Sequence, residues 1–492
     1  MLKKLRTSLA IIFLLLITLM FLDISGNLVW KLGWLAKLQF LPAVFALNVG
    51  VIIALIVLTL LLGRLYCSVI CPMGIFQDVI SRIRSRFSRN RFGYKPAARW
   101  TRLMIMVLFI ICAVLGINTV VGLLAPYSAY GRMVTSLGQP VWIWGNNLLA
   151  SWAEACDSYM FSSHELWLRS LPTLVVAVVT LLAVGITAWR SGRGYCNTVC
   201  PVGTLLGYLS KWAIFRPIID TSKCNSCGLC ARNCKSHCIN PKEHSVDMTR
   251  CVACFDCISR CRQGAISYRP VWNKPSAEHK SETVDNEGRR SFLTITGLAA
   301  TSIAANAVQK KVDGGLAVIE DRTPPSRMTR LVPAGSLSLK NMDQRCTGCQ
   351  LCISKCPNNV LRPSTSLSDM LQPTMEFDRG YCRPGCTVCS QVCPTGAITE
   401  ICCKKKTSIS IGYAVWVEKN CVVATDGVEC GNCQRHCPTG AIMMVESQKY
   451  DGRKIPVINT DKCIGCGACE YLCPARPLGA IYVEGREVHT SR

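Results

Sequence analysis

The sequence predicts a membrane-embedded helical bundle joined to two cysteine-rich α+β domains. One observation is a set of four apolar segments long enough, the first only just, to cross a hydrocarbon layer of about 30 Å. They are residues 7–22, 41–63, 103–125 and 171–189. The other observation is a four-cysteine pattern that occurs six times, twice after the last apolar segment and four times near the C-terminus. Together they divide the 492 residues into regions 1–215, 216–270, 271–330 and 331–492.

Basic residues predict how the bundle is oriented. The N-terminal flank and the link between the second and third segments are rich in lysine and arginine, whereas the link between the third and fourth has only two arginines. Because cytoplasmic flanks carry the excess of basic residues, the N-terminus and the chain after Arg190 are expected inside and the hairpin tips outside. The basic residues concerned are Lys3, Lys4, Arg6, Arg82, Arg84, Arg86, Arg89, Arg91, Arg99 and Arg102.

The formal net charge of +25 has the same explanation, since the arginines lie largely beside the apolar segments. A nucleic-acid partner is therefore not expected, and membrane lipid is. The first segment could be a cleaved signal peptide, but no small-residue cleavage site follows Leu22, so an anchor is favoured.

The cysteine pattern is the strongest chemical signal. Four copies have the spacing C-x2-C-x2-C-x3-C: Cys224, Cys227, Cys230 and Cys234; Cys251, Cys254, Cys257 and Cys261; Cys346, Cys349, Cys352 and Cys356; and Cys463, Cys466, Cys469 and Cys473. Two variants are Cys382, Cys386, Cys389 and Cys393, and Cys421, Cys430, Cys433 and Cys437. This spacing wraps a [4Fe–4S] cluster, and the fourth cysteine often ligates the neighbouring cluster. Up to six clusters in bacterial-ferredoxin-like domains, and therefore electron transfer, are predicted.

Zinc and disulfides fit the cysteines less well. Zinc sites use pairs of cysteines without the third C-x2-C step, and disulfide frameworks are typical of small secreted chains. In the first pair of motifs, exchange of the fourth cysteine would place Cys261 with the first three and Cys234 with Cys251, Cys254 and Cys257. An extra cysteine, Cys238, is interpreted as a spare thiol or as a replacement for Cys234.

Region 271–330 predicts an export signal. After a polar linker, Arg289-Arg290-Ser291-Phe292-Leu293 is followed by a weakly apolar stretch to about Val308, which is the pattern of a twin-arginine signal. Without a cleavage site the segment would remain as a fifth, anchor-like span. The domain from 331 onward would then lie in the periplasm and the first cysteine-rich domain in the cytoplasm. The alternative is a short cytoplasmic helix with two chance arginines.

A second cysteine element is repeated inside the bundle region. It occurs as GRLYCSVICPMG at 63–74 and GRGYCNTVCPVG at 192–203, each at the cytoplasmic end of an apolar segment. An internal duplication of this kind would bring four thiols together, and convergent thiolates suit a soft metal. The hypothesis is that Cys67, Cys71, Cys196 and Cys200 share iron, a small iron–sulfur cluster or copper. The alternative is a set of redox-active or merely buried thiols.

Electrons must cross the bundle if both cysteine-rich domains belong to one pathway. The apolar segments contain no histidine, so a bis-histidine haem is excluded there, and no C-x-x-C-H motif for haem attachment is present. The remaining candidates for an electron carrier within the bundle are a quinol and a metal at the repeated thiols. Neither is needed if the two domains serve different partners. Outer-loop candidates for a quinol role are Glu154, Asp157, His164 and Glu165, with Trp142, Trp144 and Trp152 nearby.

Two family resemblances cover nearly the whole chain. The four apolar segments, the repeated CxxxCP element and the first cysteine pair resemble the NapH family of membrane quinol dehydrogenase subunits. The chain from Arg289 resembles the NapG family, on the motifs RRSFL, CTGCQLCISKCP, CRPGCTVCSQVCP, CVVATDGVECGNCQRHCP and CIGCGACEYLCP. The departures are the prolines missing after Cys234 and Cys261.

The resemblance implies a natural fusion in the inner membrane that oxidises a quinol, such as menaquinol, and passes electrons to a periplasmic reductase or its cytochrome c, commonly for nitrate reduction. In proteins with four such motifs the first commonly pairs with the fourth and the second with the third, although sequential pairing stays open. The NapH-like half also resembles membrane ferredoxins that reduce copper during oxidase assembly. A third hypothesis is that electrons move outward from a cytoplasmic donor.

Overall fold

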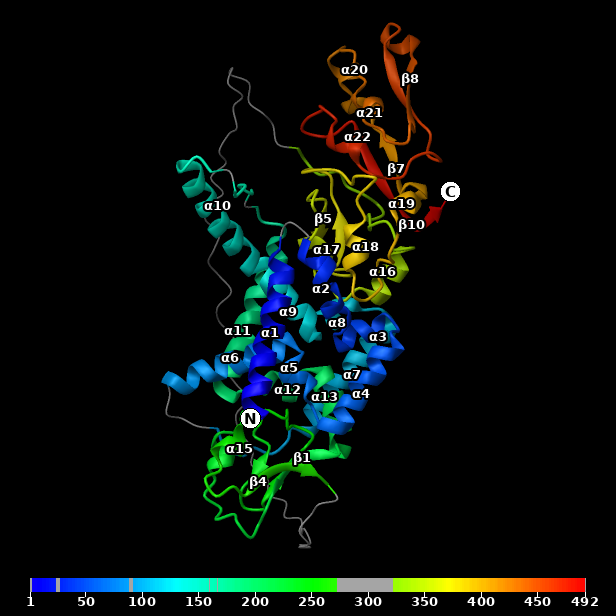
Figure 1. Cartoon of the computed structure of the whole chain (residues 1–492). Coiled ribbons are helices and arrows are strands. Elements are labelled where there is room, and N and C mark those ends of the chain that lie inside the picture. Colours follow the sequence, from blue (N-terminus) through cyan, green and yellow to red (C-terminus); the bar gives the residue numbers. More distant parts are fainter. Residues whose placement is uncertain are drawn as a thin grey trace, which may run out of the picture.

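The computed structural model consists of a helical bundle with one cysteine-rich domain at each end (Figure 1). It describes residues 2–23, 27–87, 92–158, 160–165, 167–271 and 322–491. The twin-arginine motif and the predicted fifth span lie outside these residues. In Figure 1 the first cysteine-rich domain, in green, lies beside the N-terminus, and the second, in yellow to red, lies at the opposite end.

The bundle is built from the first 212 residues. Its main helices are α1 (Leu2–Leu22), α2 (Asn27–Lys37), α3 (Phe40–Phe45), α4 (Val49–Leu62), α6 (Pro72–Phe87), α7 (Arg99–Leu115), α8 (Asn118–Leu124), α9 (Pro126–Met133), α10 (Gln139–Ala155), α11 (Leu171–Ser191) and α13 (Pro201–Leu209). Short pieces are α5 (Tyr66–Val69), α12 (Gly194–Thr198), the π-helix η1 (Val134–Gly138) and η2 (Ser210–Trp212). Among the described helices, α1 and α11 are long and apolar enough to cross a membrane.

Two of the four predicted spans are divided into two helices each, so the prediction of four membrane spans stays a prediction. Residues 41–63 form α3 and the 14-residue α4, separated at Leu47, whose φ is +53°. Residues 103–125 form α7 and α8, because Gly116 adopts the left-handed conformation that ends α7. Apolar composition reports burial and not backbone direction, so it did not reveal these breaks.

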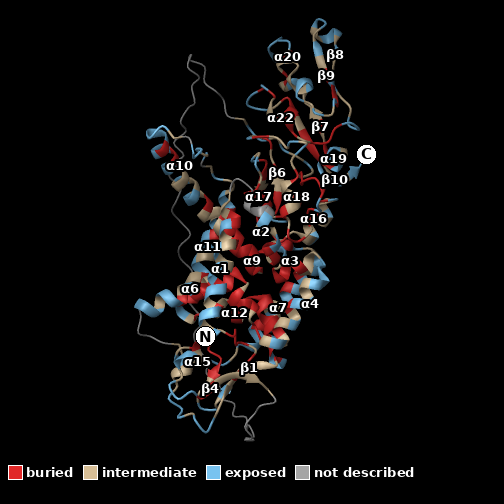
Figure 2. Ribbon diagram, viewed as in Figure 1, coloured by how far each residue is buried: buried red, intermediate tan, exposed pale blue. Residues whose placement is uncertain are grey.

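The bundle has a packed interior and an apolar outer surface. Buried residues concentrate where α1, α9 and the short helices α5 and α12 meet (Figure 2). The outward faces of the long helices nevertheless carry many large apolar side chains. On α7, for example, Met104, Val114 and Leu115 are 69%, 80% and 67% exposed. Soluble proteins rarely expose contiguous apolar patches of this extent.

The first cysteine-rich domain is a small α+β unit. Its first and last strands, β1 (Phe215–Ile219) and β4 (Ile266–Pro270), pair antiparallel with Phe215 opposite Pro270. Between them lie α14 (Leu229–Arg232), the short pair β2 (Ile239–Asn240) and β3 (Ser245–Val246), and α15 (Asp256–Arg260). Each helix contains the third cysteine of its motif, Cys230 or Cys257.

The second cysteine-rich domain repeats this arrangement twice. Its elements are α16 (Leu339–Arg345), α17 (Leu351–Ser354), β5 (Leu361–Pro363), β6 (Pro373–Met375), α18 (Val388–Val392), α19 (Cys403–Ser408), β7 (Ile409–Trp416), η3 (Glu418–Asn420), α20 (Val422–Thr425), α21 (Asn432–Arg435), β8 (Ile442–Glu446), η4 (Gln448–Tyr450), β9 (Lys454–Ile458), α22 (Ala468–Tyr471) and β10 (Ile481–Ser491). The strands pair antiparallel as β5–β6, β8–β9 and β7–β10. The long β7–β10 pair ties the end of the chain to its middle.

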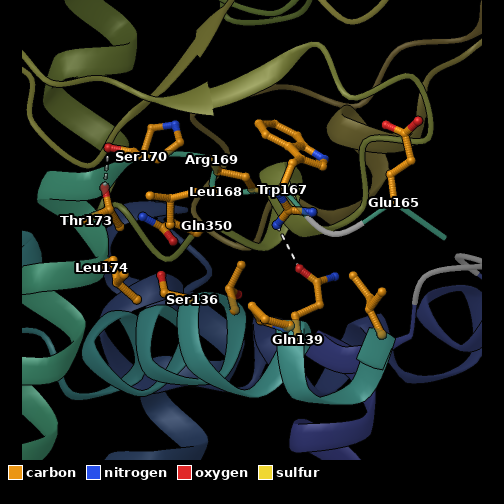
Figure 3. Close-up of a pocket in the computed structure, with 14 residues that line it drawn as sticks. Ser136, Gln139, Glu165, Trp167, Leu168, Arg169, Ser170, Thr173, Leu174 and Gln350 are labelled. Carbon is orange, nitrogen blue, oxygen red and sulfur yellow. Dashed lines mark hydrogen bonds between the residues drawn. The ribbon is translucent and has the colours of Figure 1, made fainter. Parts of the chain in front are cut away.

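The second domain contacts the bundle closely. A side chain added at Gly131 in α9 would lie 2.6 Å from the carbonyl oxygen of Cys349 and 2.7 Å from the ring of Phe21. Lys355 donates to the carbonyl oxygen of Asp23 at the end of α1 and lies 3.3 Å from its carboxylate. On the other side, residues 167–170, η1 and α10 meet the loop around Gln350 (Figure 3).

Replacing Gly131 by alanine is expected to loosen this contact. The added methyl group overlaps both the Cys349 carbonyl and Phe21, and overpacking of this kind costs about 1–3 kcal/mol. Hydrogen exchange of residues 346–356 should become faster than in the wild type. Gly145→Ala is the matched control, because nothing lies within 4 Å of its added Cβ. Equal exchange in both variants would contradict the close contact.

Candidate functional site

Four of the six cysteine motifs share one backbone conformation. In each, the residue before the second cysteine and the residue after it have positive φ. The pairs are Ser226 and Gly228, Ala253 and Phe255, Gly348 and Gln350, and Gly465 and Gly467. Left-handed residues turn successive N–H groups toward one side, which creates the concave, anion-binding backbone typical of iron–sulfur sites. The backbone N–H of Gly348, for instance, lies 3.4 Å from the Cys346 sulfur.

The first domain brings its eight motif cysteines together as two sets. One cavity, of about 250 Å³, is lined by Cys224, Cys227, Cys230 and Cys261. A second is lined by Cys251, Cys254, Cys257 and Cys234, together with Cys238. The fourth cysteine of each motif therefore lies with the other motif. The Cys238 sulfur lies 3.4 Å from that of Cys234, so both thiols face the same cavity.

In the second domain neighbouring motifs share their cysteines. Cys382, Cys386 and Cys389 line a cavity with Cys356, and Cys421, Cys430 and Cys433 line one with Cys473. The complementary sets are Cys346, Cys349 and Cys352 with Cys393, and Cys463, Cys466 and Cys469 with Cys437. The pairing is sequential, which corrects the expectation that the first motif pairs with the fourth. The strands β5–β6 and β8–β9 close each half locally and leave no need for a distant partner.

Burial makes these thiols depend on a bound cation for deprotonation. It is the largest cause that raises the pKa of Cys254, Cys349 and Cys466, each to about 12. Iron–sulfur ligation requires the thiolate, and metal binding supplies the positive charge that releases the proton. The donor sets, all sulfur and with left-handed loops in four of the six motifs, fit [4Fe–4S] clusters.

The repeated CxxxCP element forms a separate four-thiol site inside the bundle. Cys67, Cys71, Cys196 and Cys200 are all nearly fully buried. Burial raises the pKa of Cys200, and the neighbouring thiols Cys196, Cys71 and Cys67 raise it further. The two copies of the element therefore meet, one from each half of the bundle.

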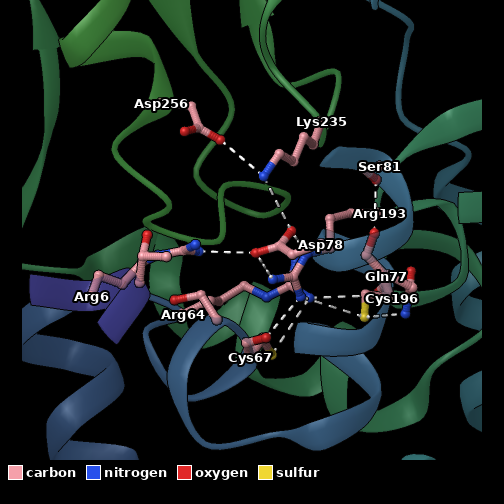
Figure 4. Close-up of polar contacts among 12 residues, drawn as sticks. Arg6, Arg64, Cys67, Gln77, Asp78, Ser81, Arg193, Cys196, Lys235 and Asp256 are labelled. Atoms are coloured by element: carbon pink, nitrogen blue, oxygen red, sulfur yellow. Dashed lines mark hydrogen bonds and ion pairs between the residues drawn. The ribbon is translucent and has the colours of Figure 1, made fainter. Parts of the chain in front are cut away.

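The two copies are interlocked by their arginines. Arg193 of the second copy donates to the carbonyl oxygen of Cys67 at 2.7 Å, and Arg64 of the first donates to that of Cys196 at 3.3 Å (Figure 4). Each guanidinium also lies about 4 Å from the sulfur of its own copy, 3.9 Å for Arg64 to Cys67 and 4.0 Å for Arg193 to Cys196. The crossing is a pseudo-twofold arrangement of the duplicated element.

A glycine in each copy allows this close packing. A Cβ at Gly74 would lie 2.2 Å from the Cys67 carbonyl oxygen, and one at Gly203 would lie 2.2 Å from that of Cys196. The proline that follows Cys71 or Cys200 starts α6 or α13, so both thiols sit at a helix N-terminus. The N–H of Gly203 donates to the Cys200 sulfur at 3.3 Å. Helix N-termini favour thiolate over thiol.

Charge at the site is unevenly balanced. Asp78 neutralises Arg193 at 2.8 Å and also contacts Arg6 at 3.0 Å and Lys235 at 3.6 Å. The second copy has Gly207 where the first has Asp78, and no acidic side chain in the described part of the chain pairs with the fully buried Arg64. A buried cation without a carboxylate is costly. An anionic group held by four thiolates would balance it.

The thiols are not arranged tightly around a single ion. Among the described residues, no three histidine, cysteine or acidic side chains form a group that could hold one metal ion, and this applies equally to the ferredoxin-type motifs. A cluster of four irons and four sulfides is wider than one ion, so its thiolate ligands stand further apart.

Polar contacts connect the four-thiol site to the first domain. Lys235, which follows Cys234, bridges Asp78 and Asp256 (Figure 4), and its carbonyl oxygen accepts from the backbone N–H of Arg193 at 2.9 Å. On the opposite side, the Tyr195 hydroxyl donates to the Leu124 carbonyl.

Arg132 continues this connection to the second domain. It is fully buried and donates to the carbonyl oxygens of Gly122 at 2.8 Å and Gly348 at 3.4 Å. Gly348 lies within the first motif of the second domain. The four thiols therefore lie between the two domains.

The structure separates the outer-loop candidates. Glu165 lines a cavity beside the first motif of the second domain, whereas Glu154 and Asp157 lie on the exposed surface and His164 pairs with Asn147 instead. Trp142, Trp144 and Trp152 are largely exposed. Among the remaining cysteines, Cys112 is buried and Cys156, Cys402 and Cys403 are exposed. Sequence reasoning missed Asp78 and the crossing arginines, although the arginine recurs in both copies of the repeat.

Comparisons with known proteins separate the CxxxCP region of the bundle from the second cysteine-rich domain. A family model described as a 4Fe-4S dicluster domain matches residues 345–397 and 428–476. A second, described as a 4Fe-4S binding domain, matches residues 44–91 and 172–220, which contain the two CxxxCP elements. No solved structure matches the chain significantly. Two kinds of [4Fe–4S] domain are therefore present.

Several curated relatives are ferredoxin-type proteins. The methylamine utilization ferredoxin-type protein MauM of Methylobacillus flagellatus is 31% identical over 167 residues, which cover 32% of this chain and 70% of the relative. The ferredoxin-type protein NapG of Escherichia coli is 29% identical over 201 residues, covering 38% and 81%. The putative electron transport protein YccM of Escherichia coli is 26% identical over 222 residues, covering 45% and 55%. This is an iron–sulfur electron-transfer protein, and the chain belongs to the MauM and NapG family of ferredoxin-type proteins.

Proposed function

We propose that this protein is embedded in the inner membrane, oxidises a quinol and passes the electrons to a reductase system on the periplasmic side. The observation that carries the proposal is the place of the four-thiol site. The two cysteine-rich domains lie at opposite ends of an apolar bundle (Figure 1), and the buried thiols lie between them. An electron crosses such a distance only in short steps, so an intermediate site is needed.

The apolar surface of the bundle supports a membrane location. Many large apolar side chains of α1, α7 and α11 are exposed. Helices of 21 residues span about 31 Å, the thickness of a hydrocarbon layer. The paired segments α3–α4 and α7–α8 would complete four crossings with breaks buried against protein. The first domain then lies in the cytoplasm and the second in the periplasm.

The six cysteine sets of the two domains are the proposed cluster ligands. In the first domain they are Cys224, Cys227, Cys230 and Cys261, and Cys251, Cys254, Cys257 and Cys234. In the second they are Cys346, Cys349, Cys352 and Cys393; Cys382, Cys386, Cys389 and Cys356; Cys421, Cys430, Cys433 and Cys473; and Cys463, Cys466, Cys469 and Cys437. A [4Fe–4S] cluster supplies reversible one-electron transfer when bound.

The four-thiol site is proposed to hold a further iron–sulfur cluster. The match of both CxxxCP elements to a 4Fe-4S binding domain supports iron over copper. Arg64 and Arg193 supply positive charge next to the thiolates, and Gln77 donates to the Cys196 sulfur at 3.1 Å. Hydrogen bonds and cations beside cluster sulfurs raise the reduction potential. A raised reduction potential would let the site accept electrons from a neighbouring centre that a quinol has reduced.

Reduction by a quinol tests the function directly. The full-length protein in detergent, kept without oxygen, should lose its iron–sulfur absorption on addition of menadiol, and a periplasmic electron acceptor should restore it. A protein that is reduced by dithionite but not by menadiol or ubiquinol-1 would overturn quinol oxidation. The outward route from a cytoplasmic donor would then be favoured.

A further inference from the structure

A cavity of about 50 Å³ lies where the bundle meets the second domain (Figure 3). Its walls come from η1 and α10, from the chain that leads into α11, and from the loop of the first motif of the second domain. Thr135, Gln139, Arg169 and Gln350 contribute polar groups to its lining.

Two polar groups in the lining have no hydrogen-bond partner among the described residues. Gln350 is 3% exposed, and its Nε2 amide has no hydrogen-bond acceptor in the described structure. Thr135 is 4% exposed, and its hydroxyl is likewise unpaired there. Buried polar groups are normally satisfied, and each unsatisfied one costs free energy that a ligand can recover. The two groups therefore call for a ligand that offers oxygen atoms.

Neighbouring side chains hold this lining in place. Gln139 donates to the Ser354 carbonyl oxygen at 3.4 Å and accepts from Arg169 at 2.7 Å. Thr135 lies in the π-helix η1, and π-helical turns inside α-helices are frequent at functional sites. Arg169 also lies over the ring of Trp167, which lines the same cavity.

We propose that this cavity binds the head group of a quinol, an inference that rests on the function proposed above. A quinol ring carries two hydroxyl groups, which accept from an amide N–H and donate to a hydroxyl oxygen. The enclosed volume suits the oxygen-bearing edge of a ring, and the apolar side chains of Ile143 and Leu174 in the same lining suit the remainder. Gln350 directly follows Cys349, so the ring edge would adjoin the first motif of the second domain.

The chemistry of the site balances without a further reagent. A quinol loses two O–H protons and two electrons and becomes a quinone with two carbonyl groups. Cys346, Cys349, Cys352 and Cys393 would hold the iron–sulfur centre that serves as oxidant, and such a centre would supply one-electron acceptance. The protons leave toward solvent through Glu165, which lines the cavity and has a side chain that is 87% exposed.

Thr135→Val tests the site with two opposite expectations. The substitution keeps the side-chain volume and removes an unpaired hydroxyl, so the unliganded protein should be as stable as the wild type or more stable. The KM for menadiol should nevertheless rise about tenfold, because a hydrogen bond to the ligand is lost. Reduction by dithionite should not change. A purely structural role would lower stability and leave KM alone.

Two further variants complete the experiment. Gln350→Met should raise the KM for menadiol by a similar factor. Its iron content should equal that of the wild type, which would show that the adjoining iron–sulfur centre is retained. Thr180→Val is the matched control, because its hydroxyl donates to Val176 within α11, and its KM should equal that of the wild type. A wild type reduced by menadiol or ubiquinol-1 with unchanged KM in Thr135→Val and Gln350→Met would overturn this site and leave the proposed function standing. A wild type reduced by neither quinol would overturn both.

Discussion

Replacing Cys196 by alanine is expected to interrupt electron transfer between the two cysteine-rich domains. The four thiols of the CxxxCP elements are the ones that the described structure groups together between those domains, and Cys196 contributes both a sulfur and the carbonyl oxygen that Arg64 contacts. The variant should lose about four iron atoms per chain, the content of one cubane cluster. The clusters of the two domains should remain, because their ligands lie elsewhere.

Vesicles provide the measurement. The full-length protein is inserted into liposomes that contain ferricyanide, and dithionite, which does not cross the membrane, is added outside. The wild type should reduce the trapped ferricyanide, and Cys196→Ala should fall to the rate of protein-free vesicles. Cys112→Ala is the control, since Cys112 is buried in α7 and belongs to no cysteine set. Wild-type iron content and rate in Cys196→Ala would contradict a conducting role for the site.

The second large effect is expected from Asp78→Asn. Its carboxylate contacts Arg6, Arg193 and Lys235, and its side chain is 8% exposed. Removing one partner of a buried ion pair leaves uncompensated charge and costs about 3–5 kcal/mol. Because the three cations come from α1, from the repeat element and from the first domain, the loss should appear both in overall stability and in the attachment of that domain.

The pH dependence of this effect follows from the carboxyl group. Burial alone would raise the pKa of Asp78, but Arg193, Lys235 and Arg6 outweigh it and hold that pKa well below its usual range. A carboxyl group whose pKa is lowered in the folded protein contributes its full stabilisation above its unfolded pKa of about 4. That contribution is lost only as the pH falls below this value. The difference between wild type and variant should therefore be constant from about pH 5 to 8.

Denaturant unfolding in detergent, with hydrogen exchange of residues 234–257, measures both consequences. Glu154→Gln serves as the control, because Glu154 lies on the exposed surface of α10 and its loss should change stability by less than about 0.5 kcal/mol. If Asp78→Asn unfolded at the same denaturant concentration as Glu154→Gln, the three cations would not depend on this carboxylate.

Local spacing determined the cysteine chemistry. A C-x2-C-x2-C step confines three thiols to one loop, and its glycines and small residues accept the left-handed conformations observed at Ser226, Gly348 and Gly465. That information lies within about seven residues, so it was readable without the fold. The exchange of Cys234 and Cys261 between the first two motifs followed from the same local reasoning.

Longer-range features needed the tertiary structure. The pairing of the last four motifs depends on which strands close each half, and the four cysteine spacings are compatible with either choice. The breaks at Leu47 and Gly116 depend on backbone angles that apolar composition does not report. The quinol candidates of the outer loop were separated because only Glu165 is carried to the second domain by the turn before α11.

The sequence by itself therefore determined the ligand type, the number of cysteine sets and the duplication that places two CxxxCP elements in the bundle. Only the tertiary structure decided that Arg64 and Arg193 cross between the two elements and that Asp78 balances one of them. Ligand spacing is a property of a short segment of chain. Charge compensation and the Thr135–Gln350 cavity arise where residues more than a hundred positions apart meet, which spacing alone does not report.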